Sequence, residues 1–350
     1  MLAIETSCDE TAAAVITGTG TIASSVLCSQ HDVHERYGGV VPELAARRHI
    51  ETVDTIAMEA LRKAGMTWRD IQAVAVTSGP GLAGALLVGV SFGKSLAYAL
   101  RVPLIAVNHL EGHIASAWVD QPDFPVPCVV LVVSGGHTHL YLVEADGGLR
   151  VLGKTLDDAA GEAFDKAAKI LGLGFPGGPA IDRLAGTGRA NAVTFPRAYL
   201  EPDSLDFSFS GLKTALLYHW QDQGESASAD SVADVAAGFQ EAIVDVLVEK
   251  AFRAVRRHRV SALAVVGGVS ANSRLRARLA ARAAEAGIQL ALPPLSLCTD
   301  NAAMIAAASQ RAYRQGRLAA WELEASADLL LSTVTETQPR RARRTGARRA

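Results

Sequence analysis

A series of apolar segments occurs twice along the chain, and this repetition limits the folds open to it more than any other feature. The first half opens on a predicted hairpin of two apolar strands around the polar turn 6–11, and the second half opens on a similar hairpin around the turn 134–138. Farther along each half, an apolar strand, a Gly-rich turn and a helix follow one another, at 73–100 and at 262–286. The repeated order predicts a duplicated α/β architecture with a ligand cleft between the two copies.

Periodicity and turn residues divide the remainder of the chain into further elements. We expect strands near 21–29, 104–107, 149–153 and 289–292, and helices at about 42–63, 109–113, 161–171, 177–185, 212–221, 232–257 and 301–314. The uncharged stretch Ile71–Gly93 is long enough to suggest a membrane span, but Ser78-Gly79-Pro80-Gly81 divides it into a strand and a helix. We therefore predict that this stretch does not span a membrane.

Two lobes are predicted, an N-terminal lobe at 1–120 and a C-terminal lobe at 121–300. The last helix, about 301–330, is expected to pack back on the N-terminal lobe. The tail 331–350 is rich in arginine, with six arginines and no acid from Arg340 onward, and is predicted to be disordered. The net formal charge of the chain is −2, so the body without these six arginines carries −8. An acidic body is not typical of a protein that binds nucleic acid alone.

Cysteine usage and the start of the chain favour a cytoplasmic protein. The four cysteines (Cys8, Cys28, Cys128 and Cys298) form no C-x-x-C pair, and they fit reduced thiols better than disulfides or a zinc ribbon. Glu5 follows the first four residues, which include no basic residue, so no signal peptide is expected.

The two hairpin turns carry the residues best suited to bind a nucleotide. Ser134-Gly135-Gly136-His137-Thr138 offers glycines that let the backbone approach an anion, and successive N–H groups that can surround it. The turn 6–11 supplies hydroxyl groups and two acids, Asp9 and Glu10, that could orient a nucleophile or a second ion. Taken singly, each turn is better explained as a tight hairpin. Their matching positions in the two halves favour a nucleotide cleft.

Two further Gly-rich segments are candidates for nucleotide contact. Gly267-Gly268-Val269-Ser270-Ala271-Asn272 follows an apolar strand and opens a helix, so it can present N–H groups and an Asn to a ligand, although this signal alone is weak. Gly174-Phe175-Pro176-Gly177-Gly178-Pro179 lies between Asp165 and Asp182. These carboxylates could hold ribose hydroxyls, and solvated acids at helix ends are the ordinary alternative.

His109 and His113 lie four residues apart on one face of a predicted helix, so both imidazoles can bind one metal ion. Asp300 could supply a third ligand, or it could simply cap the helix that follows it. Two histidines and one carboxylate with open positions suit Fe(II) or zinc. A zinc protease would place a Glu directly after the first His, where this chain has Leu110. Glu111 lies about 200° around the helix from His109 and is expected to point away from the metal.

Several segments together resemble the motifs of one family. They are Ile4-Glu5-Thr6-Ser7-Cys8-Asp9-Glu10-Thr11, Pro42-Glu43-Leu44-Ala45, His109-x-x-x-His113, Ser134-Gly135-Gly136-His137-Thr138, Phe207-Ser208-Phe209-Ser210-Gly211-Leu212-Lys213-Thr214, Gly267-Gly268-Val269-Ser270-Ala271-Asn272 and Thr299-Asp300-Asn301. The chain resembles the bacterial tRNA adenosine threonylcarbamoyltransferase family (TsaD), formerly named O-sialoglycoprotein endopeptidases. The resemblance covers roughly residues 1–330 and leaves out the Arg-rich tail. It implies a duplicated actin-like, sugar-kinase-like ATPase fold, with two lobes around a nucleotide cleft.

The resemblance also implies site residues, a cofactor and partners. The family's metal ligands correspond to His109, His113 and Asp300, and the metal is most often iron. Its adenylate-binding positions correspond to Val132, Val133, Ser134, Gly135, Gly136, Asp165, Gly178, Asp182 and Asn272. Family members work with a smaller homologous subunit (TsaB-like) and a small ATPase (TsaE-like).

The implied activity is an acyl transfer to tRNA. The threonylcarbamoyl group of threonylcarbamoyl-AMP would pass to the exocyclic amine of the adenosine 3′-adjacent to the anticodon, in tRNAs reading ANN codons, with release of AMP. Asp9 or Glu10 is expected to orient the amine or accept its proton. Three alternatives stay open: a small-molecule kinase of the same fold, which would not need H-x-x-x-H; a metal-dependent peptidase, which lacks its Glu; and a non-catalytic scaffold, which would lack metal ligands.

Overall fold

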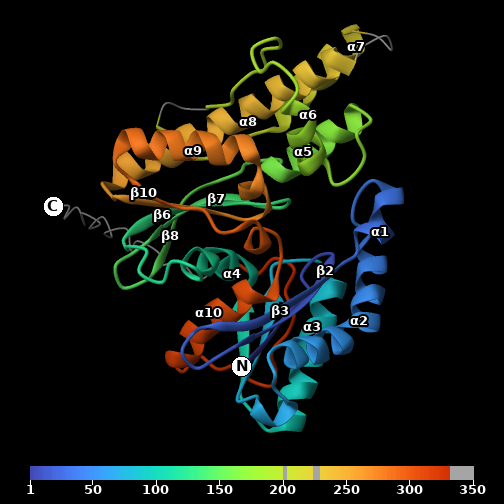
Figure 1. Cartoon of the computed structure of the whole chain (residues 1–350), viewed down its shortest axis with the longest axis vertical. Helices are drawn as coiled ribbons and strands as arrows, with labels where there is room; N and C mark the ends of the chain where they lie inside the picture. The colour runs from blue at the N-terminus through green and yellow to red at the C-terminus, as the bar shows by residue number, and fades with distance from the viewer. Residues whose placement is uncertain (200–202, 224–228, 332–350) are drawn as a thin grey trace, which may run out of the picture.

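The computed structural model describes residues 1–199, 203–223 and 229–331, and it contains two five-stranded sheets (Figure 1). The first sheet has the order β3-β2-β1-β4-β5, built from β1 (Leu2–Glu5), β2 (Glu10–Ile16), β3 (Ile22–Ser29), β4 (Val74–Gly79) and β5 (Leu104–Asn108). The second has the order β10-β9-β6-β7-β8, built from β6 (Cys128–Val133), β7 (Thr138–Val143), β8 (Leu149–Lys154), β9 (Ala262–Val266) and β10 (Gln289–Ala291).

The two sheets have the same topology. In each, the first three strands form an antiparallel meander, and the fourth and fifth strands add in parallel on the far side of the first. The predicted duplication is therefore confirmed at the level of strand order and direction. The central position of β6 in the second sheet explains its uninterrupted apolar sequence, since a strand covered on both faces has no polar side.

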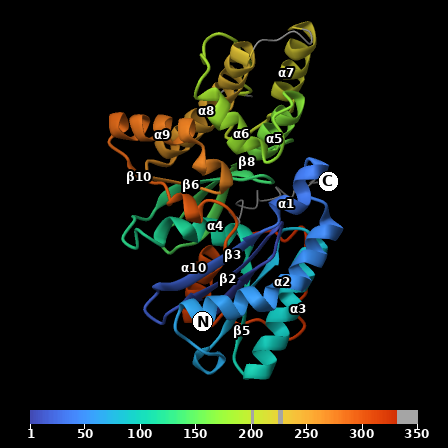
Figure 2. The same ribbon diagram turned by 45° about the vertical axis from the view of Figure 1, so that its right-hand side comes forward.

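Helices cover both faces of each sheet (Figures 1 and 2). Those of the described residues are α1 (His31–His34), α2 (Pro42–Lys63), α3 (Ala83–Leu100), α4 (His109–Ala115), α5 (Ala160–Ile170), α6 (Gly177–Ala185), α7 (Ser210–Gln223), α8 (Ala229–His258), α9 (Ser273–Ala286) and α10 (Ala302–Arg314). On the first sheet, α2 and α3 bury one face and α10 buries the other. On the second sheet, α5 and α8 bury one face and α4 the other.

The helices α4 and α10 exchange places between the two halves. Helix α4 follows β5 of the first sheet, yet its Leu110 and Ile114 pack under the second sheet. Helix α10 follows β10 of the second sheet, yet its Met304 and Ile305 pack under the first. The two helices touch each other where they cross, because Gly112 of α4 has no side chain: a Cβ there would lie 2.7 Å from Ile305 Cδ1. The crossing brings two sequence-distant segments, after β5 and before α10, to one place.

The predicted elements agree with the structure within a few residues, with three differences. Strand β2 begins at Glu10, which pairs with Ser29, so the first hairpin turn is shorter than predicted and ends at Asp9. Helix α1 was not predicted, because four residues are too few for a periodic pattern. The last helix ends at Arg314, as the pattern at 301–314 predicts, and the wider range of about 301–330 is wrong because the rest of it is irregular. The predicted disorder of the tail concerns residues 332–350, which lie outside the described residues, and the boundaries of the lobes stay a prediction.

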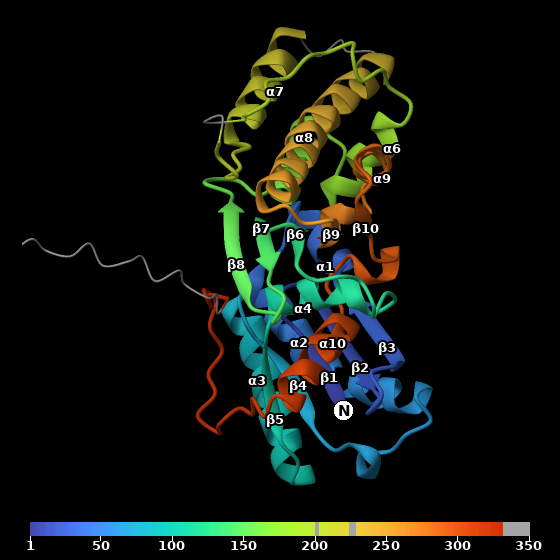
Figure 3. The ribbon, with the colours of Figure 1, turned by 90° about the vertical axis from the view of Figure 1, so that its left-hand side faces the viewer.

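The C-terminal segment that follows α10 runs back along the first sheet (Figure 3). The N–H of Ala319 donates to the carbonyl of Leu104 at 2.8 Å, and the N–H of Ser326 donates to that of Ser78 at 2.8 Å. Farther on, the side chain of Asn108, at the end of β5, donates to the carbonyl of Leu329 at 3.2 Å. The segment thereby passes the end of β5 where α4 begins.

The predicted division of Ile71–Gly93 is confirmed, since β4 ends at Gly79 and α3 starts at Ala83. Among the described residues, α3 is the one helix long and apolar enough to cross a membrane by length and composition. It packs against α2 and β4 in the first half of the fold, and core helices of globular proteins commonly meet the same criterion.

Candidate metal and nucleotide site

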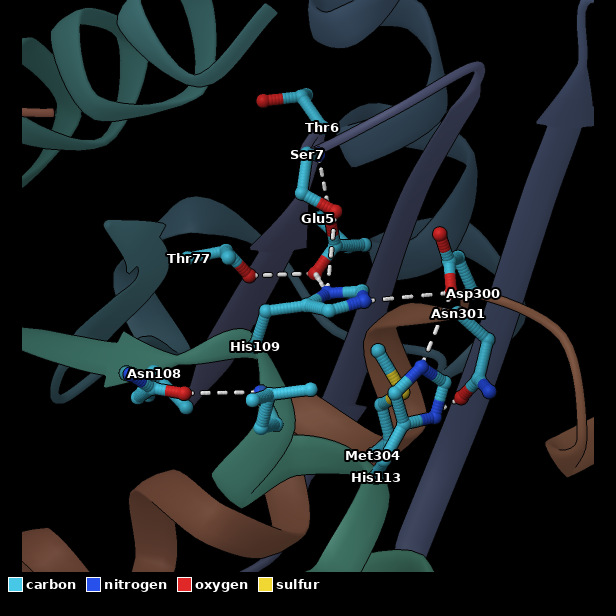
Figure 4. Close-up of polar contacts among 12 residues, drawn as sticks. Glu5, Thr6, Ser7, Thr77, Asn108, His109, His113, Asp300, Asn301 and Met304 are labelled. Carbon is cyan, nitrogen blue, oxygen red and sulfur yellow. Dashed lines mark hydrogen bonds and ion pairs between the residues drawn. The ribbon is translucent and has the colours of Figure 1, made fainter. Parts of the chain in front are cut away.

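Helices α4 and α10 bring the three predicted metal ligands together where they cross (Figure 4). His109 Nε2 lies 3.4 Å from Asp300 Oδ1, and His113 Nε2 lies 3.2 Å from the same oxygen. One ligand atom of each residue lies within 4.8 Å of the others. Both imidazoles are buried, and the carboxylate of Asp300 is 20% exposed. The arrangement can hold one metal ion with room for further ligands on the Asp300 side.

The segment before α10 assigns separate roles to Asp300 and Asn301. The side chain of Asn301 caps α10, because its Oδ1 accepts from the N–H of Met304 at 2.9 Å. The N-cap of α10 is thus Asn301 and not Asp300. The carboxylate of Asp300 turns instead toward the two histidines.

The chemistry of the donor set fits a metal ion. His113 is fully buried, and among the described residues neither of its ring nitrogens makes a hydrogen bond of good geometry. A buried imidazole with unpaired nitrogens is unfavourable unless something else binds it. His113 Nε2 lies 3.2 Å from Asp300 Oδ1, and a buried imidazole nitrogen beside a carboxylate oxygen suits the binding of a cation.

The charges of the site show how strongly it attracts positive charge. Burial lowers the pKa of His109, but the carboxylates of Asp300 and Glu5 outweigh burial and hold that pKa well above its usual value. Burial raises the pKa of Asp300, yet the facing His109 and His113 hold it well below its usual value. Carboxylates and imidazoles that face one another in this way favour positive charge at the site.

Helix α2 supports the turn that carries Asp9. The ring of His49 donates from Nε2 to the carbonyl of Cys8 at 2.9 Å, and its Nδ1 accepts from the hydroxyl of Thr11 at 2.8 Å. Burial, together with the carboxylates of Asp9 and Asp300, raises the pKa of Glu10 to about 10. The charges of Asp9 and Asp300 thus both act on Glu10. The sequence analysis did not identify His49 as a residue that supports the turn, because the only indication was its position in a predicted helix.

The second hairpin turn is held by its own hydrogen bonds. The N–H of Ser134 donates to the carbonyl of His137 at 2.8 Å, and the N–H of His137 donates to Ser134 Oγ at 3.2 Å. Gly135 and Gly136 are exposed, and a Cβ on either would meet no atom within 4 Å, so their backbone is open to a ligand. Val132 and Val133 are fully buried in β6. They hold the strand from which the turn projects.

His137, in the second hairpin turn, has a ring contact with His139, and sequence reasoning gave it no separate role. Burial lowers its pKa to about 3, and the neighbouring rings of His109, His139 and His113 add to this effect. The imidazole of His137 is therefore neutral at ordinary pH and offers a polar group without a charge.

The remaining predicted residues connect the ends of three helices. Asp165 Oδ1 on α5 accepts from the N–H of Gly177 at 2.7 Å, where α6 begins. Asp182 on α6 accepts from the N–H of Ser273 at 3.0 Å and from its hydroxyl at 2.8 Å, where α9 begins. Asn272 caps α9 and donates to Gln240 Oε1 at 2.7 Å. Next to them, a Cβ on Gly178 would meet no atom within 4 Å.

The position of Glu111 agrees with the prediction that it points away from the metal. Its Oε1 lies 3.0 Å from Arg317 Nη2 of the C-terminal segment, in an ion pair on the surface. A metallopeptidase needs a carboxylate that can reach a metal-bound water, and this side chain is held elsewhere. The peptidase alternative is therefore not favoured.

Comparison with known proteins agrees with the motifs. Residues 21–307 match the family described as TsaD, tRNA N6-adenosine threonylcarbamoyltransferase. The enzyme of that name from Anaeromyxobacter dehalogenans (strain 2CP-C) is 55% identical over 326 residues, which cover 93% of this chain and 97% of the relative. Its counterpart from Clostridioides difficile (strain 630) is 48% identical over 331 residues, which cover 95% of this chain and 98% of the relative.

Similarity to a solved structure confirms the fold class. Component A of the Acidaminococcus fermentans (R)-2-hydroxyglutaryl-CoA dehydratase, an actin-like fold, superposes with a TM-score of 0.53 at 17% identity. The match covers 91% of this chain and 98% of that one, and at this identity it bears on the fold alone. By sequence, the chain belongs to the TsaD family of tRNA N6-adenosine threonylcarbamoyltransferases.

Proposed function

We propose that this chain is an acyltransferase that moves the threonylcarbamoyl group of threonylcarbamoyl-AMP to the exocyclic amine of the adenosine 3′-adjacent to the anticodon, in tRNAs reading ANN codons. The observation that carries the proposal is the cluster of two buried histidines, His109 and His113, with the part-exposed Asp300, in a duplicated fold. A kinase of the same fold would need the turns and not the cluster.

In this reaction, the amine nitrogen attacks the carbamoyl carbon and forms the new C–N bond. The bond between that carbon and the phosphate oxygen breaks, and AMP leaves with the electron pair. The proton lost by the amine passes to a carboxylate or to solvent. No oxidation or reduction takes place, so any metal acts without changing its charge.

The adenylate is bound by the second half of the fold. The open backbone of Gly135 and Gly136 receives the phosphate, since successive N–H groups form a concavity for anions. The N-terminus of α9, which donates from Ser273 to Asp182, adds partial positive charge to the second half. The full set proposed for the adenylate is Val132, Val133, Ser134, Gly135, Gly136, Asp165, Gly178, Asp182 and Asn272.

His109, His113 and Asp300 would hold one divalent metal ion, with Fe(II) as the first candidate and zinc as the second. Such an ion would supply a Lewis acid for the acyl transfer. Asp9 and Glu10, where the first hairpin turn meets β2, orient the attacking amine or accept its proton. The raised pKa of Glu10 favours its protonated form, which suits orientation, and leaves acceptance of the proton to Asp9.

The tRNA is engaged together with partner proteins, a smaller homologous subunit (TsaB-like) and a small ATPase (TsaE-like), in the cytoplasm. The support for partners is the charge: the body without the six tail arginines carries −8, which repels a polyanion. A partner with a basic surface would offset that repulsion.

The proposal is tested by reconstitution with unmodified tRNA, labelled threonine, bicarbonate, ATP and partner proteins of established activity. We expect label in the tRNA, and we expect the label to disappear with His113→Ala. Absence of label with the wild-type chain would refute the activity. Phosphorylation of a small molecule, or metal-dependent proteolysis lost with His109→Ala, would support the kinase or the peptidase instead.

A further inference from the structure

Glu5, at the end of β1, is a fully buried carboxylate with no lysine or arginine beside it among its recorded contacts. Its Oε1 accepts from the N–H of Ser7 at 2.5 Å, and its Oε2 accepts from the hydroxyl of Thr77 at 2.5 Å. The same Oε2 lies 3.3 Å from His109 Nδ1 (Figure 4). A buried carboxylate is costly unless donors surround it, and here the histidine is one of those donors.

The two nitrogens of His109 face different groups. Nδ1 faces Glu5, and Nε2 faces Asp300 at 3.4 Å. A neutral imidazole carries one N–H proton. A group that accepts a hydrogen bond from Nδ1 keeps this proton on Nδ1 and leaves a lone pair on Nε2. Only that tautomer can bind a metal through Nε2 in the cluster.

Ser7 cannot determine which nitrogen of His109 carries the proton. Its hydroxyl lies 3.0 Å from His109 Nδ1, but a hydroxyl can donate or accept and therefore tolerates both tautomers. An ionised carboxylate can only accept. Ser7 also cannot form a serine nucleophile with His109, since it and Glu5 approach the same ring nitrogen, whereas a triad needs them on opposite nitrogens.

We propose that Glu5 is a positioning residue, which holds the proton of His109 on Nδ1 and so presents the lone pair of Nε2 to the metal. Thr77 keeps the carboxylate aimed by occupying the other side of Oε2. Sequence reasoning gave neither residue a role. The inference rests on the proposed metal site and adds to it the group that selects the tautomer of one ligand.

Glu5→Gln tests the idea with almost no change of shape. The Ser7 N–H cannot rotate away, so the amide oxygen must take the place of Oε1, and the amide NH₂ then takes the place of Oε2. Thr77 can rotate its hydroxyl and accept, but His109 Nδ1 must now accept as well. The ring proton moves to Nε2, which faces Asp300, and blocks the metal.

The measurement is calorimetric titration of the full chain with Zn²⁺ alone, for wild type and variants at one pH. We expect Glu5→Gln to bind zinc about 10–100-fold more weakly, the usual effect of losing a carboxylate behind a metal-bound histidine. Glu111→Gln makes the same change on the metal helix, at a side chain paired with Arg317, and should leave affinity unchanged. Thr77→Val keeps the carboxylate and should lose less affinity than Glu5→Gln.

Equal zinc affinities of wild type and Glu5→Gln would overturn this inference while leaving the metal site in place. A wild-type chain that binds no zinc, iron or manganese would overturn both. If Glu5→Gln does not fold, ¹⁵N NMR of the zinc-loaded wild type decides the matter: we expect a proton on His109 Nδ1 and zinc on Nε2. Zinc on Nδ1 would refute the role of Glu5.

Discussion

Helix α5 begins directly against the second hairpin turn, and Gly161→Ala tests whether the position of that turn controls transfer. Gly161 lies in the first turn of α5 and donates its N–H to the carbonyl of Ser134 at 3.2 Å. A Cβ at this position would lie 2.6 Å from the Ser134 oxygen and 2.7 Å from Gly135 Cα. Both neighbours are backbone, so the added methyl cannot be relieved by a side-chain rotation.

The size of the effect follows from these distances. The turn must move by roughly 0.6–0.8 Å to reach an ordinary contact at about 3.4 Å. Overpacking of this kind costs about 1–3 kcal/mol, and Ala offsets about 1 kcal/mol because it favours the helix over Gly. We therefore expect a folded protein, less stable by about 0–2 kcal/mol. A displacement of 1 Å at a reacting group can cost about 100-fold in rate, so transfer should fall by about 10–100-fold.

The assay is label transfer to tRNA in the reconstituted system, together with thermal unfolding of each variant. Gly211→Ala is the matched control, because Gly211 also lies in the first turn of a helix, α7, and a Cβ there meets no atom within 4 Å. It should keep its activity and gain up to about 1 kcal/mol of stability, since Ala favours the helix over Gly. Wild-type transfer by a correctly folded Gly161→Ala would refute the reasoning, since the turn would then tolerate the displacement.

Four further substitutions test other parts of the structure. Asp300→Asn should weaken zinc binding by more than the roughly 10–100-fold loss expected when a residue behind a metal ligand is replaced, and circular dichroism should show that α10 is intact. Asn301→Ala should bind zinc like the wild type but be less stable by about 1 kcal/mol, because it removes the cap of α10. Asn108→Ala removes the cap of α4 and the bond to Leu329, so it should cost about 1 kcal/mol or more in denaturant unfolding, and unchanged stability would count against the link to the C-terminal segment. Burial lowers the pKa of Lys250 from 10.5 to about 8, so between these two pH values the unfolded chain binds more protons than the folded chain. The free energy of unfolding of the wild type, relative to that of Lys250→Met, should therefore rise with pH in this range. A difference in unfolding free energy that does not change between pH 8 and 10.5 would contradict the lowered pKa.

Local sequence already determined much of this protein. The alternation of apolar strands with polar turns predicted both hairpins, and the break at Gly79-Pro80-Gly81 predicted the end of β4 before α3. The spacing of His109 and His113 placed both rings on one side of α4, and it turned Glu111 away to meet Arg317. These features depend on neighbours a few residues apart, where helix and strand geometry alone decide direction.

Contacts between distant segments could not be read in the same way. Asp300 could have been a cap, and only the crossing of α4 and α10 turned its carboxylate to the histidines while Asn301 took the cap. Glu5 lies 104 positions before His109, and they meet because β1 and β5 flank β4 in one sheet. The reason is physical: a local pattern determines which face is apolar, whereas packing of those faces decides which polar groups are buried together.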